Sequence, residues 1–110
     1  MKFRQGDIIE VDFNPTLGHE PQSRRPALVV SNDDYNLTTS MTIVCPITSW
    51  NNDFYLHEPL PEGTSITGTI ALEQVRALDL VARKAKKIDQ LEKAYLDPIL
   101  ICIQSFFLGS

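Results

Sequence analysis

The segment Asp7-Ile8-Ile9-Glu10-Val11-Asp12-Phe13 indicates the fold most directly, because apolar and acidic residues alternate from position 9 to position 13. Side chains two positions apart in a β-strand point to the same face, so this segment predicts a strand with one apolar and one acidic face. Residues 41–48 repeat the alternation, and residues 27–30 form a short apolar run of the kind found in central buried strands. The first half of the chain therefore predicts strands.

The segments between and after these strands predict loops, a short helix and further strands. Ser31-Asn32-Asp33-Asp34 is typical of a helix cap followed by a turn or two. The polar, proline-containing segment Trp50–Gly63 predicts a loop with a short edge strand at Phe54–Leu56. Thr64–Leu72 alternates again and predicts a strand, and Val75–Leu80 predicts another one beside it.

The C-terminal segment predicts a helix. Proline lacks a backbone N–H and breaks a longer helix, so Leu91–Leu96 is expected to form a separate helical turn. Asp97 would then cap the final helix, with Pro98 at its first position. Ile99–Leu108 is apolar nearly all round, which indicates burial in a core or in a subunit interface. We therefore expect a mainly β fold, a small antiparallel barrel or half-barrel of about five to seven strands closed by a C-terminal helix.

Length and charge limit the classes of protein. The 110 residues fit a single domain spanning positions 1–110. The 10 Lys and Arg residues and 14 Asp and Glu residues give a net charge of −4, which argues against coating nucleic acid by bulk charge but permits a local basic site. No apolar run approaches the roughly 20 residues of a membrane span, and no signal peptide precedes Gly6, so a cytoplasmic protein is expected.

Cysteine and histidine spacing argues against a metal site. Cys45 and Cys102 lie in apolar surroundings and are expected to be small buried side chains and not a disulfide. His19 and His57 are far apart, no cysteine pair has metal-ligand spacing, and no glycine-rich phosphate loop is present. No metal and no other cofactor is expected.

Polar residues of unusual type concentrate in three segments: Pro15–Glu20 with the following Arg24-Arg25-Pro26, then Pro46–Ser49, then Leu72–Arg76. Their order and spacing, after the opening Gly6-Asp7, resemble the MazF/PemK family of bacterial toxin–antitoxin toxins. The resemblance runs from Gly6 to Gly109. It implies an SH3-like barrel, a homodimer, metal-independent and sequence-specific cleavage of single-stranded RNA, and an antitoxin that blocks the site.

The resemblance also implies roles for particular residues. The catalytic arginine and threonine of the family fall on Arg25 and Thr48, the acidic residue of the Gly-His-Glu loop on Glu20, and the histidine of some members on His19. The aspartate of other members falls on Glu73, which keeps the charge on a longer side chain. A guanidinium suits the negative charge of a phosphorane, and a hydroxyl can donate to a phosphate oxygen. Either His19 or Glu20 is expected to move the proton, a choice that the sequence leaves open.

A further set of residues is expected to contact RNA. Aromatic side chains near the site can stack on unpaired bases, although they can equally anchor a loop. The basic run Arg83–Lys87 is the only positive cluster in an acidic chain, and it can follow phosphates or receive an acidic antitoxin segment. The expected RNA-contacting residues are Ser49, Trp50, Phe54, Glu73, Gln74, Arg76, Lys84 and Lys86.

Two other functions compete with the endoribonuclease. One is a non-enzymatic toxin of the same fold that poisons a protein target such as DNA gyrase. The other is an SH3-like binding module without toxicity. Arg25, Thr48 and the Gly-His-Glu loop distinguish the three, because only an RNA-cleaving site needs them.

Overall fold

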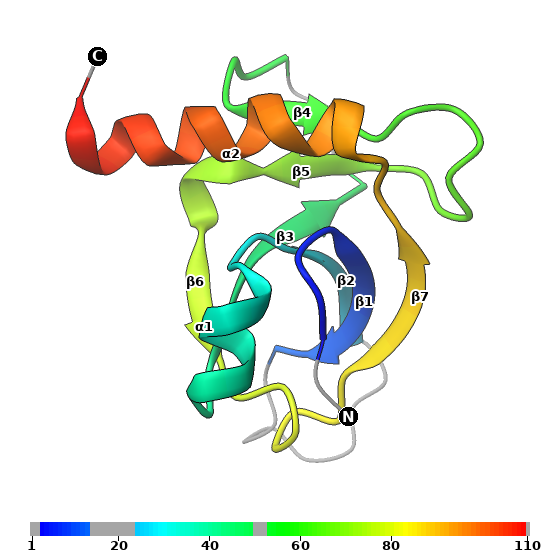
Figure 1. Cartoon of the computed structure of the whole chain (residues 1–110). Coiled ribbons are helices and arrows are strands. Elements are labelled where there is room, and N and C mark those ends of the chain that lie inside the picture. The colour runs from blue at the N-terminus through cyan, green and yellow to red at the C-terminus, as the bar shows by residue number, and fades with distance from the viewer. Residues whose placement is uncertain (1–2, 14–23, 50–52, 110) are drawn as a thin grey trace.

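The computed structural model describes residues 3–13, 24–49 and 53–109. These residues form one curved antiparallel sheet, two α-helices and a short 3-10 helix (Figure 1). In chain order the elements are β1 (Asp7–Asp12), β2 (Arg24–Val29), α1 (Asp33–Thr38), β3 (Thr42–Thr48), β4 (His57–Pro59), β5 (Thr69–Ala71), η3 (Leu72–Gln74), β6 (Arg76–Leu78), β7 (Lys86–Gln90) and α2 (Lys93–Leu108).

Strand β3 organises the sheet, whose order is β4-β5-β3-β2-β1-β7. One edge of β3 pairs with β2, and the other pairs first with β6 and then with β5, so that η3 lies where one partner gives way to the other. The predicted mainly β, antiparallel architecture with a C-terminal helix is confirmed. Within the described ranges the pairing ends at β4 and β7, so the sheet is open and not hydrogen-bonded into a closed barrel.

Both faces of the central strands are buried, and this divides the core into two apolar clusters. Ile8 points into the cluster beneath α2, whereas its neighbour Ile9 points into the other. Double-sided burial explains why residues 27–30 are continuously apolar. The second cluster contains Ile9, Val11, Ala27, Val29, Val44, Leu78 and Leu80.

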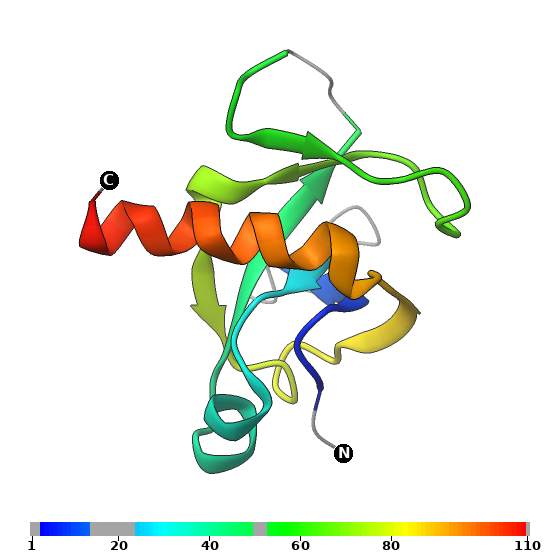
Figure 2. The ribbon, with the colours of Figure 1, turned by 45° about the horizontal axis from the view of Figure 1, so that its top comes forward.

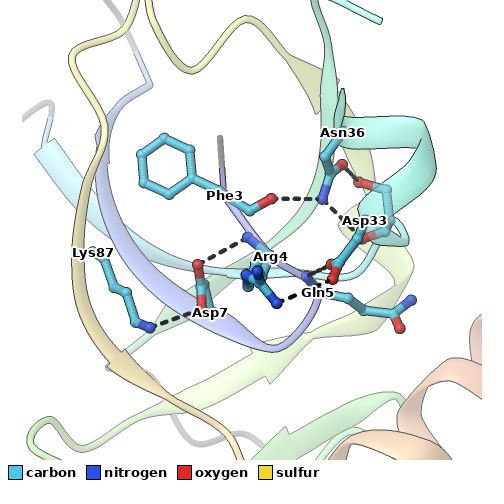
Figure 3. Close-up of polar contacts among 8 residues, drawn as sticks. Phe3, Arg4, Gln5, Asp7, Asp33, Asn36 and Lys87 are labelled. Atoms are coloured by element: carbon cyan, nitrogen blue, oxygen red, sulfur yellow. Dashed lines mark hydrogen bonds and ion pairs between the residues drawn. The ribbon is translucent and has the colours of Figure 1, made fainter. Parts of the chain in front are cut away.

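Polar contacts of residues 3–7 attach the N-terminal segment to α1 and β7 (Figure 3). The backbone N–H of Gln5 donates to Asp33 Oδ1 at 2.9 Å, and Asn36 Nδ2 donates to the carbonyl oxygen of Phe3 at 3.1 Å. Lys87 Nζ lies 3.2 Å from Asp7 Oδ1. Helix α1 begins as predicted, because the Asn32 side chain accepts the backbone N–H of Tyr35.

Two strand predictions in the second half are wrong in their bounds. The edge strand is β4, three residues after the predicted Phe54–Leu56, because the backbone N–H of His57 bonds to the carbonyl oxygen of Phe54 and closes a turn there. The predicted strand Thr64–Leu72 is reduced to β5. It begins after Gly68, whose φ of +150° departs from strand geometry, and it ends where η3 turns the chain into β6.

The predicted break at Pro98 is also wrong. A single helix α2 crosses the sheet from residue 93 to residue 108, with Glu92 and not Asp97 at its N-cap position (Figure 2). Proline inside a helix costs roughly 3 kcal/mol or more. Leu96, Ile99 and Ile103 are buried against the sheet on both sides of the proline, at about 1.5–3 kcal/mol each, and this burial offsets the lost hydrogen bond. No helix in the described part of the chain is long and apolar enough to cross a membrane.

Candidate active site

The pairing of β2 with β3 brings the two predicted catalytic residues together. Ala27 pairs with Pro46 in the last pair of β2 with β3, and Arg25 and Thr48 each lie two residues further along their strands, on the faces of Ala27 and Pro46. Directly opposed residues of antiparallel strands share one face, with Cβ atoms about 4.5–5.5 Å apart. On its other side Thr48 pairs with Thr69, whose hydroxyl donates to the carbonyl oxygen of Thr48 at 3.3 Å. Arg25 and Thr48 therefore lie on one face of the sheet, held by three neighbouring strands.

A surface cavity of about 310 Å³ opens on this face. Its lining holds Phe13 directly after β1, Arg25 of β2, Pro46 of β3, Gln74 of η3 and Arg76 of β6. The Arg76 guanidinium lies 5.6 Å from the centre of the Phe13 ring, within cation–π distance. Two guanidinium groups and one amide, with no carboxylate among the described lining residues, form a site suited to an anion such as a phosphate.

The neighbouring Arg24 and Arg25 differ in their contacts because successive strand residues point to opposite faces. Arg24 Nε lies 2.9 Å from Glu10 Oε1, and its Nη2 donates to the carbonyl oxygens of Glu10 and Lys84. Arg25 is exposed, and no hydrogen bond or ion pair connects it to any residue that the structure describes. Arg24 is thus a structural side chain, and Arg25 is available to a ligand.

Glu73, at the middle of η3, is paired with a histidine that the sequence did not single out. His57 Nε2 lies 3.0 Å from Glu73 Oε2. The rings of Phe54 and His57 pack edge to face, with ring centres 5.1 Å apart. Burial, with a smaller contribution from the Glu73 charge, raises the pKa of the Cys45 thiol to about 12. Only the pairing of β4 with β5 shows that His57 lies near Glu73, and a single sequence does not reveal this pairing.

The structure brings some of the remaining predicted residues to this face and places others elsewhere. Gln74 and Arg76 line the cavity, Phe54 packs on His57, and Ser49 is exposed directly after β3. Lys84 and Lys86 line a different cavity of about 530 Å³, whose lining also includes the apolar residues Phe3, Leu80 and Val81. The predicted residues His19, Glu20 and Trp50 lie outside the described residues. No cluster of three or more His, Cys, Asp or Glu side chains that could hold a metal ion occurs within residues 3–13, 24–49 and 53–109.

Comparisons with known proteins agree with this fold. The family model described as PemK-like, MazF-like toxin of type II toxin-antitoxin system matches residues 4–107. The chain belongs to this family. It is 37% identical over 110 residues to the endoribonuclease toxin ChpB of Escherichia coli K12, an alignment that covers 94% of this chain and 93% of the relative.

Solved structures of MazF from Deinococcus radiodurans have the same fold. The crystal structure of MazF alone matches with a TM-score of 0.83 and 28% identity, covering 100% of this chain and 99% of that chain. A MazE–MazF crystal structure from the same organism matches with a TM-score of 0.81 and 25% identity, covering 99% of this chain and 97% of that chain. The family resemblance inferred from the sequence motifs is therefore confirmed.

Proposed function

We propose that this chain is the toxin of a toxin–antitoxin pair and acts as a metal-independent, sequence-specific endoribonuclease on single-stranded RNA. The observation that carries the proposal is the cavity in which Arg25 and Arg76 converge, on the face that also holds Thr48. The family membership of the chain and the endoribonuclease activity named for its relative ChpB support the same function.

The proposed mechanism uses the RNA's own 2′-hydroxyl as the nucleophile. Its oxygen attacks the adjacent phosphorus, the bond from phosphorus to the 5′-oxygen breaks, and a 2′,3′-cyclic phosphate remains. Arg25 stabilises the phosphorane charge, because a guanidinium is always protonated and its planar fork matches phosphate oxygens. Thr48 donates a hydrogen bond to a phosphate oxygen. The two proton carriers suggested by the motif, His19 and Glu20, belong to this proposal as well.

The RNA strand is proposed to run along the face around the cavity. Arg76 and Gln74 line the cavity and are proposed to contact phosphates and base edges, and the exposed Ser49 and Phe54 are proposed as further RNA contacts. Phe54 is 39% exposed, which leaves part of its ring available to stack on a base. Trp50 is proposed to act in the same way. Lys84 and Lys86 are proposed to contact more distant phosphates or an acidic antitoxin segment.

The proposal extends to partners, domain organisation and location. We infer a homodimer of single-domain chains in the cytoplasm, with a cognate antitoxin as the inhibitor. The match to a MazE–MazF crystal structure supports an antitoxin partner. An acidic, partly apolar antitoxin segment that folds on contact would suit the same cationic cavity. Nothing observed favours a gyrase poison or a non-toxic binding module.

Cleavage of a long RNA by the purified chain tests this function. We expect discrete fragments that end in a 2′,3′-cyclic phosphate, and the same fragments with a chelator present, because the proposed mechanism assigns no step to a metal ion. A matched oligonucleotide with a single 2′-deoxy sugar at the mapped site should remain intact. Cutting of that oligonucleotide at the normal rate would exclude attack by the 2′-hydroxyl.

A further inference from the structure

His57 forms a pair with Glu73, and none of the functions assigned so far uses this histidine. The side chain of His57 is only 7% exposed, whereas that of Glu73 is 33% exposed. Their contact, 3.0 Å between Nε2 and Oε2, joins the edge strand β4 to η3. The Glu73 carboxylate thus faces outward with one oxygen held by a covered imidazole, and its other oxygen, Oε1, is not part of this contact.

Strand pairing places this pair on the same face as the cavity. His57 pairs with Ala71, and the register of β3 with β5, continued by one residue, sets Ala71 opposite Pro46. His57 and the cavity residue Pro46 therefore share one face, two strands apart, or about 10 Å at the usual strand spacing. Glu73 lies in η3, two residues after Ala71 and directly before the cavity residue Gln74.

We propose that His57 is a positioning residue that holds Glu73 as the general base for RNA cleavage. This inference rests on the proposed function and names a residue for one of its steps. A carboxylate on a flexible side chain gains a defined direction when a covered imidazole N–H donates to one of its oxygens, as histidine partners do in other catalytic pairs. Such a restraint matters more for glutamate than for a shorter acid, because the longer side chain has more freedom to rotate.

The proposed step balances as follows. Glu73 Oε1 takes the proton of the 2′-hydroxyl while the 2′-oxygen forms its bond to phosphorus. The bond from phosphorus to the 5′-oxygen breaks, and the proton carrier suggested by the motif, His19 or Glu20, supplies the proton to that leaving oxygen. His57 does not touch the RNA. It keeps its proton on Nε2 and fixes the orientation of the carboxylate throughout.

Cleavage kinetics of four variants test the pairing. His57→Ala should lower kcat about 10–100-fold with little change in KM, the usual cost of losing such a supporting contact. Glu73→Gln should lower kcat about 10²–10⁴-fold, the contribution of a general base. His57→Gln keeps an N–H donor at the position of Nε2 and should recover most of the rate lost in His57→Ala. The double variant His57→Ala/Glu73→Gln should be no slower than Glu73→Gln alone, since both changes remove one unit.

Glu58→Gln is the matched control, because Glu58 follows His57 on β4, is exposed and points to the opposite face. It should cleave at the wild-type rate. Rates are measured well below the melting temperature of each variant, so loss of fold is separated from loss of the base. A wild-type rate in His57→Ala, no recovery in His57→Gln, or multiplicative losses in the double variant would each overturn the role of His57 alone. A wild-type chain that cuts no RNA would overturn the proposed function itself.

Discussion

At the scale of single residues, the site depends on which way neighbouring side chains point. Arg24 and Arg25 have the same chemistry, yet Arg24 is bound to Glu10 and to the backbone of Lys84, while Arg25 lines the cavity. A guanidinium that is already paired with a carboxylate attracts a phosphate less strongly than a guanidinium that faces solvent. Because successive side chains of β2 point to opposite faces, Arg24 has a structural role and Arg25 faces the proposed site.

The first prediction compares these two arginines and Thr48. Arg25→Ala should lower the cleavage rate about 10²–10³-fold, the scale for losing a preorganised donor to a transition state. Thr48→Ala should lose a smaller factor, because a neutral hydroxyl stabilises developing charge less than a guanidinium does. Both variants should melt close to the wild-type temperature, since neither side chain belongs to an apolar cluster. Single-turnover cleavage and thermal melting measure the two effects.

Arg24→Ala is the control for that comparison. Its ion pair with Glu10 is partly exposed, so its loss should lower the free energy of unfolding by about 1 kcal/mol or less and leave cleavage near the wild-type rate. An Arg24 variant as slow as the Arg25 variant would show that the loss of either arginine acts through the fold.

At the scale of elements, the start of β5 determines where Thr48 lies. Gly68 approaches the end of β3 so closely that an added Cβ would lie 2.8 Å from the carbonyl oxygen of Thr48 and 2.9 Å from Ile47 Cγ2. Only glycine fits between these atoms, because one of them is backbone. The close approach keeps β5 paired with the residue that the mechanism needs.

The second prediction follows from this contact. Gly68→Ala should lower the free energy of unfolding by about 1–3 kcal/mol, the range for overpacking, and should also slow cleavage because the backbone of Thr48 must shift. Gly63→Ala is the matched control: Gly63 also has a positive φ, of +91°, but an added Cβ there meets nothing within 4 Å. It should be destabilised by backbone strain alone and cleave normally. Equal loss of cleavage in both variants would contradict the role given to the close approach.

At the scale of the whole molecule, α2 leaves apolar side chains uncovered. Its inner side packs on the sheet through Leu96, Ile99 and Ile103, whereas Ile101 is 67% exposed and Phe107 is 76% exposed. Large apolar side chains gathered on one helix are typical of a surface that meets another protein. A symmetric pair of chains is the most common way to cover such a surface.

The third prediction is that two copies associate through this side of α2. Sedimentation at micromolar concentration should give a dimer, and Ile101→Asp should shift the equilibrium toward the monomer because a charge would be buried in the interface. Gln104→Asp introduces the same charge at an exposed polar position of α2 and should dissociate the dimer less. A monomeric wild-type chain would exclude the dimer.

The sequence by itself determined the features that depend on near neighbours. The strands at β1, β2 and β3, the Asn32 cap of α1 and the mainly β class follow from alternation and capping, which act over a few residues. The family motifs pointed to Arg25 and Thr48, and their placement on one face agrees with that prediction without testing their roles.

Only the tertiary structure decided the features that depend on distant partners. Helix α2 continues through Pro98 because burial against the sheet outweighs a local propensity, and β4 lies after the predicted strand because a turn and the pairing with β5 set its bounds. The contact of His57 with Glu73 joins residues 16 positions apart, and Lys84 and Lys86 are separated from the cavity of Arg25. Strand pairing and packing bring such residues together or apart, and neither is encoded in the spacing of a single segment.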